Sequence, residues 1–314
     1  MAMMKFADAQ TVQSTGAFLV GELERLDPTL YEPLSEFTAL RDVNLRQDVT
    51  IADQVSSFML STYAANGAPA QKKSWAKALT SAIQRTSVAA TKVINPITPW
   101  AEEVAFSIIE LAQAQQSGRP IDRQKIDAMR MKHDLDFDLQ TYFGDAELGV
   151  KGLLNSTDVT SENVGALSSS SVASDYIDAF NAVLNRAWEN SKYTRFPKNL
   201  LVPPALFSTI ASMQLPNTNV NLLNYIRENN VASASGQAIA INPCKYLDPA
   251  FGGSNTPRIV AYTKESRYVR MPLVPLQHTQ PQFRGLDQAT VYYAAFGALE
   301  IVYPQMMYYA DLAD

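Results

Sequence analysis

The chain has 314 residues, a formal net charge of −5 and a single cysteine, Cys244. This length allows a sizeable core and about two sub-domains, whereas one cysteine excludes an internal disulfide framework and fits a reducing cytoplasm. The acidic balance lacks the basic footprint of a direct nucleic-acid binder. The sequence contains no apolar run of about 20 residues, so we expect no membrane span, and its first residues lack the apolar core of a signal peptide.

Charged residues make up 18% of the chain, against about 25% in ordinary soluble domains. Ser, Thr, Asn, Gln, Tyr and Met fill the difference. The cores of protein interfaces are depleted in Lys, Glu and Asp and enriched in aromatic residues and Met. The composition therefore favours a surface that other protein covers, with an ordinary low-charge monomer as the alternative.

Residues 1–49 combine short helical signals with helix breakers. They lead into a segment typical of a strand, in which Val43, Leu45, Val49 and Ile51 occupy odd positions. An arm that lies over a neighbour fits this pattern, and a hairpin of helices fits nearly as well.

Residues 50–97 predict a long extended excursion, with strand-like text at 58–63 and a turn at 64–69. The excursion is basic, and no acid occurs between Asp53 and Glu102. A lone hairpin cannot bury a core of its own. It is therefore either solvated or laid on an adjacent, acidic subunit. The basic residues of the excursion that precede its final strand-like segment are Lys72, Lys73, Lys77 and Arg85.

Residues 98–156 predict two helices. Pro99 and the acids Glu102 and Glu103 are typical of a helix start, and apolar residues recur at helical spacing as far as Ser117. A second helix is expected from about Ile121 to Phe143, on the order of 35 Å long. One face of it carries Ile121, Ile126, Met129, His133, Phe137 and Tyr142, and Gly144 is placed to end it. A helix of this length serves as a spine for other elements.

Residues 157–265 predict an α/β lobe that begins with a Ser-rich connector at 166–172. Helices are expected at 175–188, 207–213 and 220–229, and strands at 198–202, 238–243 and 258–262. The rest of the chain is strand-rich, with β-branched and aromatic runs at 268–273, 290–296, 299–304 and 306–309.

No catalytic constellation is present in the sequence, and we expect no enzyme, cofactor or metal site. His133 and His278 have no ligand spacing, and Cys244 reads as a small packed residue. In the run from His133 to Asp138, Asp134 and Asp138 share one helix face. We interpret this face as solvated or partner-facing.

The order of these parts resembles the major capsid proteins of tailed bacteriophages with the Hong Kong 97-like fold. The segments 100–117 and 121–144 are similar to the spine of that family, and residues 152–155 (Gly-Leu-Leu-Asn) are similar to the junction after the spine. The resemblance implies an α+β fold with five parts. They are an N-terminal arm with the first strand at 1–49, an extended loop (E-loop) at 50–97, a peripheral domain with the spine helix at 98–156, an axial domain at 157–265, and return strands of the peripheral domain at 266–314.

The resemblance also implies a structural protein of the virion. Copies would assemble in the host bacterial cytoplasm into pentamers and hexamers of an icosahedral head that encloses double-stranded DNA. Expected partners are other copies of the chain, a portal, and scaffold or decoration proteins. We expect Lys72, Lys73, Lys77 and Arg85 of one copy to contact Asp134 and Asp138 of the next.

Two departures from the family pattern and three alternatives accompany this interpretation. Fewer than fifty residues precede the extended loop, so no built-in scaffold segment is expected, and no partner Asn for a Lys–Asn cross-link is identifiable. The nearest alternative is an encapsulin-type nanocompartment with the same fold. The others are a small cytoplasmic hydrolase that uses the run around His133, and a structural adaptor that forms no shell.

Overall fold

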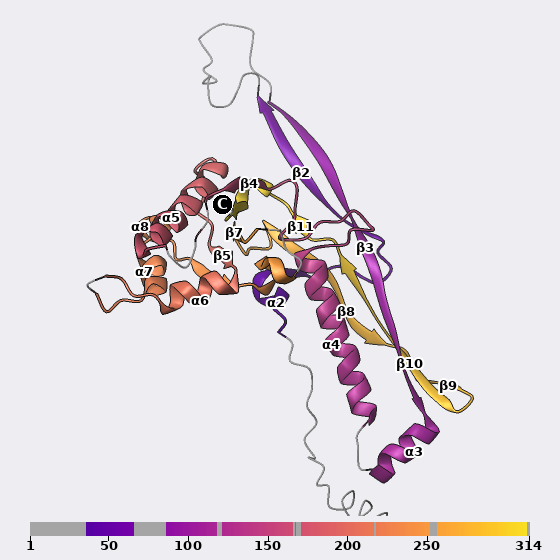
Figure 1. The fold of residues 1–314 in the computed structure, drawn as a ribbon. Coiled ribbons are helices and arrows are strands. Elements are labelled where there is room, and N and C mark those ends of the chain that lie inside the picture. The colour runs from indigo at the N-terminus through magenta and orange to yellow at the C-terminus, as the bar shows by residue number, and fades with distance from the viewer. Residues whose placement is uncertain are drawn as a thin grey trace, which may run out of the picture. The chain divides into compact units, whose positions relative to one another are not determined.

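The computed structural model describes residues 36–65, 86–117, 121–165, 167, 171–216, 218–251 and 256–312. The chain divides into two compact units, Met1–Glu36 and Phe37–Asp314, and every element below lies in the second (Figure 1). Residues 1–35 of the expected N-terminal arm, residues 66–69 of the expected turn and the basic residues Lys72, Lys73, Lys77 and Arg85 fall outside the described residues, whereas Ala64 and Ala65 of the expected turn end a strand.

The first sheet has seven strands and contains the long hairpin. Its main path runs β1 (Asn44–Arg46), β8 (Val269–His278), β10 (Asp287–Gly297), β3 (Thr86–Ser107) and β2 (Val55–Ala65). Two short strands lie off this path: β9 (Gln282–Arg284) pairs with β10, and β11 (Glu300–Ile301) pairs with β8. The β1–β8 pair is parallel and the others are antiparallel.

β3 has two partners in succession. Its first half pairs with β2, from Thr86 opposite Ala65 to Pro96 opposite Val55. Its second half pairs with β10, from Ile97 opposite Gly297 onward. Among the described residues β2 pairs with β3 alone, so the distal hairpin is a two-stranded ribbon (Figure 1).

The helix expected to start near Pro99 is wrong as far as Ser107, because this stretch is the second half of β3. The burial of the side chains alternates in this stretch: Val104 is buried, whereas Ala101, Glu103 and Ala105 are exposed. Period-two burial is the mark of a half-buried strand, and pairing with β10 overrides the local helix signals. The helix begins only at Ile108, as α3 (Ile108–Ser117).

The predicted spine helix is confirmed as α4 (Ile121–Tyr142). Met129, His133, Phe137 and Tyr142 are buried along it. Gly144 follows with a φ of +72°, and its N–H donates to the Gln140 carbonyl at 3.0 Å. A left-handed glycine directly after a helix is the usual way to end it.

The strand expected over 43–51 is shorter than predicted. A single helical turn, α2 (Ala39–Asp42), comes first, β1 covers only Asn44–Arg46, and a turn closes between Thr50 and Asp53. The chain therefore leaves β8 after three paired residues.

The second sheet has five strands in the order β4 (Thr160–Asn163), β12 (Tyr308–Asp311), β7 (Arg258–Tyr262), β5 (Asn199–Val202) and β6 (Ala240–Pro243). Its helices are α5 (Ala173–Asn190), α6 (Pro204–Ser212), α7 (Leu222–Glu228) and α8 (Val231–Ala234). Three 3₁₀ turns, Lys245–Leu247, Pro249–Phe251 and Pro304–Met306, complete the elements. β12 lies between β4 and β7, so the last strand belongs to the sheet of the α/β lobe and not, as expected, to the first sheet.

The five-stranded sheet separates two hydrophobic clusters. Leu200, Ile259 and Tyr308 pack with α5 on one side. Their chain neighbours Leu201, Val260 and Tyr309 pack with Tyr142 of α4 on the other. Because successive strand residues point to opposite faces, the middle of this sheet is covered on both sides, and β5, β7 and β12 are accordingly mostly apolar, whereas the edge strand β4 is polar and exposed.

Candidate functional site

Within the described residues, no group of three or more His, Cys, Asp or Glu side chains is arranged to hold a metal ion, and no helix is long and apolar enough to cross a bilayer. Cys244 is buried, and burial raises the pKa of its thiol to about 12. A thiol of this kind is protonated at neutral pH and is a packed residue, as predicted.

His133 packs against aromatic rings and lies beside the carboxylate of its neighbour Asp134. Its ring centroid lies 5.2 Å from those of Trp100 and Phe296, and its Nδ1 lies 2.9 Å from Asp134 Oδ1. His278 is at the end of β8, with Nδ1 3.2 Å from the Thr279 carbonyl oxygen. The two histidines thus belong to separate surroundings, and the geometry gives the hydrolase alternative no support.

Asp138 is not on a partner-facing surface, so its predicted role is wrong. The residue is 1% exposed, and its carboxylate accepts the backbone N–H groups of Thr38 at 3.2 Å and Ala39 at 2.9 Å. Burial raises its pKa above the ordinary value. Asp138 therefore holds the N-terminus of α2, whose orphan N–H groups need acceptors.

Asp134 and Asp136 are the more accessible acids of this run. The Asp134 side chain is 51% exposed. Asp136 accepts the Trp100 indole N–H at 3.0 Å and pairs with Lys132. Sequence spacing placed Asp138 with Asp134, but it could not show that α2, about a hundred residues earlier, packs against this turn of α4.

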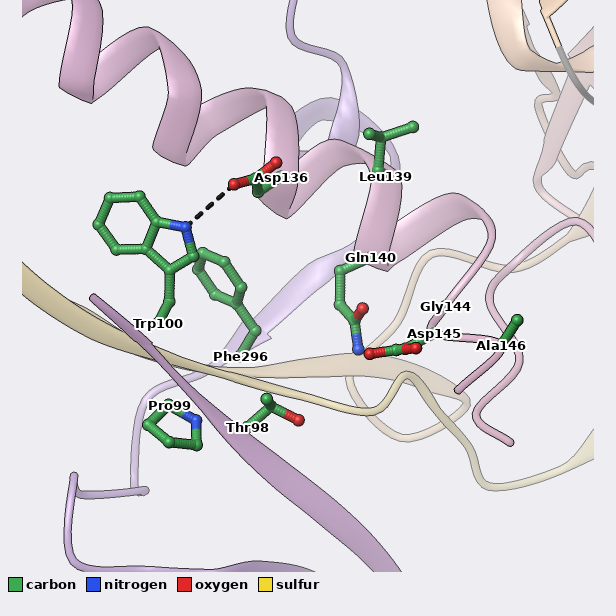
Figure 2. Close-up of a pocket in the computed structure, with 10 residues that line it drawn as sticks. All are labelled: Thr98, Pro99, Trp100, Asp136, Leu139, Gln140, Gly144, Asp145, Ala146 and Phe296. Atoms are coloured by element: carbon green, nitrogen blue, oxygen red, sulfur yellow. Dashed lines mark hydrogen bonds between the residues drawn. The ribbon is translucent and has the colours of Figure 1, made fainter. Parts of the chain in front are cut away.

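A pocket of about 350 Å³ opens between the C-terminal half of α4 and strands β3 and β10 (Figure 2). In this view the Trp100 indole points at Asp136, and Leu139 projects from the helix. Its lining consists of Thr98, Pro99, Trp100, Asp136, Leu139, Gln140, Gly144, Asp145, Ala146 and Phe296. Leu139 is 45% exposed, so the pocket offers apolar surface next to carboxylates.

The described part of the hairpin has an apolar face. Its exposed large hydrophobic side chains are Val55 (52%), Met59 (70%), Val88 (61%) and Ile94 (57%). Val88 lies opposite Tyr63, and Ile94 lies opposite Ser57. Directly opposed residues share a face, and residues two apart along a strand do too. All four side chains therefore project from one side of the ribbon, which we call the outer face.

The opposite, inner face of the hairpin lies toward the sheet near its root. Ser56 is 3% exposed, and Phe58, Val93 and Asn95 are half-buried. Several large apolar side chains exposed on one face favour a contact with another molecule, although Lys92, opposite Met59, lies on the same face. The sequence prediction for this hairpin rested on basic residues and missed the outer face. Apolar residues at even spacing on both strands were the signal that could have revealed this face.

Comparison with known proteins agrees with this geometry. A family model described as "Major capsid protein" matches residues 72–312, and no curated protein matches the chain. Among solved structures, the capsid of Myoviridae phage XM1 is similar with a TM-score of 0.78 and 14% identity, over 93% of this chain and 98% of that one.

Two further structures extend the likeness. One from Mycobacterium phage Ogopogo has a TM-score of 0.59 and 14% identity, over 99% of this chain and 100% of the other. A virus-like particle from Pyrococcus furiosus has a TM-score of 0.51 and 12% identity, over 96% and 98%. The family match over most of the chain, together with the Hong Kong 97-like fold shared with these structures, places the chain in the major capsid protein family, as a structural protein of phage-type capsids.

Proposed function

We propose that copies of this chain close into pentamers and hexamers of an icosahedral head that encloses double-stranded DNA. The observation that carries the proposal is the outer face of the hairpin, whose Val55, Met59, Val88 and Ile94 are each more than half exposed beside the described residues. A two-stranded ribbon is marginally stable alone, so a neighbouring copy is its natural cover. Contacts in a ring are head-to-tail, and the surface facing the hairpin is then a different one.

The surface we propose to receive the hairpin is the α4 pocket of the next copy. Leu139 supplies apolar area there, and Asp134 and Asp136 take the place of the predicted pair of Asp134 and Asp138. Lys72, Lys73, Lys77 and Arg85 of the approaching hairpin would face these acids. Exposed ion pairs contribute only about 0–1 kcal/mol each, so buried area supplies the holding free energy and the charges set the register.

The domain roles follow the two sheets. We assign α4 and the seven-stranded sheet to the peripheral domain, with the spine at 98–156. The axial domain is the five-stranded sheet with α5–α8, at 157–265, to which β12 is added because it pairs with β4 and β7. In this assignment the chain's role is mechanical, with no bond made or broken.

The test is a charge reversal in the hairpin, Lys72→Glu with Lys73→Glu, in the purified protein. We expect closed particles to be lost in negative-stain images and light scattering while the far-ultraviolet circular dichroism of the folded chain is kept. The matched control is Lys192→Glu, which reverses an exposed charge just after α5, outside the hairpin and the surface proposed to receive it. Normal particles from the double variant at physiological salt would contradict the charged register.

The contents of the particle decide between two uses of the same shell. The acidic total of −5 favours a container that does not bind its genome tightly, because affinity for DNA depends on basic contacts to phosphate. Assembly in the host bacterial cytoplasm, around a portal and with scaffold or decoration proteins, belongs to this proposal. Similarity to a virus-like particle supports the second candidate, a shell around protein cargo. Nuclease-treated particles that contain DNA would support the head, and particles that contain protein cargo would support the alternative.

A further inference from the structure

The root of the hairpin lies where β3 changes partner. Pro96 pairs with β2, and the next residue, Ile97, pairs with β10. Proline supplies no backbone N–H at this point. Two backbone hydrogen bonds outside the strand ladders cross the root: the Ile97 N–H donates to the Gln54 carbonyl at 3.0 Å, and the Ala298 N–H donates to the Pro96 carbonyl at 3.1 Å. Beyond the root, β2 pairs with β3 alone among the described residues, so the direction of the ribbon depends on the contacts at the root.

Side chains add a second attachment at the same place. Glu300 of β11 has a fully buried side chain. Its carboxylate accepts hydrogen bonds from Arg46 at 3.1 Å, from Arg270 and from the Ser56 hydroxyl. Arg46 also donates to Ser56 Oγ at 2.8 Å. Ser56 lies on the inner face of β2, so it ties the hairpin to a charged cluster on β1, β8 and β11.

Open space lies beside this attachment. A cavity of about 360 Å³ separates Phe58, Val93 and Asn95 of the inner face from the loop that carries Leu148 and Asp158. The Asn95 Nδ2 is buried without a hydrogen-bond partner among the described residues. A well-packed root would leave neither feature. The buried cluster therefore holds Ser56, whereas the inner face beside it borders open space.

We propose that Glu300, with Arg46 and Arg270, is a clamp that sets the direction in which the hairpin leaves the sheet. Release of Ser56 from Glu300 is the step that lets the ribbon pivot about Pro96 and Ile97 into the neighbouring cavity. Glu300 acts through Ser56 and is a positioning residue. The purpose of the pivot rests on the proposed function, because pentamers and hexamers need one sequence to reach its neighbour in different directions. The clamp itself is a property of a single chain.

The sharpest variant is Ser56→Ala, which removes the hairpin's hydroxyl and keeps the buried charges of Glu300 and the two arginines balanced. Ser57→Ala, one residue along on the outer face, is the matched control. Spin labels on Met59→Cys of the hairpin and Arg130→Cys of α4 report the direction of the ribbon by double electron–electron resonance. Cys244 is buried and so leaves the labelling specific, and dilution with unlabelled chain keeps the measured distances within one copy.

We expect a narrow distance distribution in the parent and in Ser57→Ala, and a broadened or shifted one in Ser56→Ala. The amides of Ile97 and Ala298 should exchange about 10-fold faster or more in Ser56→Ala, the factor for losing a hydrogen bond to a charged group. Amides within the β2–β3 ladder should keep their rates. An unchanged distribution, or an equal rise at all amides, would overturn the clamp. A changed distribution in Ser56→Ala with particles that form as in the parent would keep the clamp and count against its role in the proposed function.

Discussion

Met59→Glu tests whether the outer face of the hairpin holds copies together. Met59 is the most exposed of its four apolar side chains, at 70%. Full burial of a methionine contributes about 1.5–3 kcal/mol, so covering the exposed part contributes roughly 1–2 kcal/mol in each copy. A carboxylate in the same contact adds a desolvation cost of several kcal/mol. A total loss of about 3 kcal/mol or more per contact corresponds to at least a ~100-fold weaker association.

The assay is the concentration at which particles form, followed by light scattering and negative-stain microscopy, with thermal unfolding as the check on the folded chain. We expect the threshold to rise about 100-fold or more and the unfolding temperature to stay, because the Met59 side chain is 70% exposed within a single chain. Thr91→Glu is the control, since Thr91 is also exposed but lies opposite Leu60, on the other face. Equal effects of the two variants, or parent-like assembly of Met59→Glu, would refute the reasoning.

Two further predictions concern the body of the chain. Gly152→Ala should lower the free energy of unfolding by about 3 kcal/mol or more, because a Cβ there would lie 2.3 Å from the backbone at the end of α4. Gly149 has a φ of +66° and open space around it, so Gly149→Ala should lower the free energy of unfolding by only about 1–2 kcal/mol. Similar losses for the two variants in denaturant titrations would contradict this prediction. Lys198→Met should lower stability at neutral pH and have no effect at low pH. Hydrogen bonds from Lys198 lower the pKa of Glu265, so this pair stabilises the fold above the carboxyl's ordinary pKa and loses its contribution as pH falls through the lowered folded-state pKa; a pH-independent difference would speak against it.

The spine helix was predictable because its signals are local. Apolar residues at helical spacing and Gly144 as the terminator lie within one segment, and the structure has them at the expected ends. The prediction for the segment before this helix was wrong for the opposite reason. Pro99, Glu102 and Glu103 satisfy the local preferences of a helix start, yet pairing with β10, nearly two hundred residues later, makes a strand of them. Strand formation depends on a partner strand that lies outside the local sequence.

The errors in the candidate site have the same origin. Asp138 was paired with Asp134 by helical spacing, and only the packing of α2 against α4 shows that its carboxylate holds Thr38 and Ala39. β12 was assigned to the first sheet because it follows strands of that sheet in sequence, whereas it pairs with β4 and β7. The outer face of the hairpin is different, because its alternation is local and was available to the sequence analysis.

The two faces of the hairpin use different kinds of interaction, and this difference bears on how one sequence can serve several positions in a shell. The inner face is held to its own chain by directional bonds at Ser56, which are either made or broken. The outer face offers Val55, Met59, Val88 and Ile94, whose burial depends on area and hardly on angle. A ribbon attached in this way can change direction at its root and still adhere at its outer face. If the adhesion depended on directional bonds and the root on apolar packing, every change of direction would weaken the contact between copies.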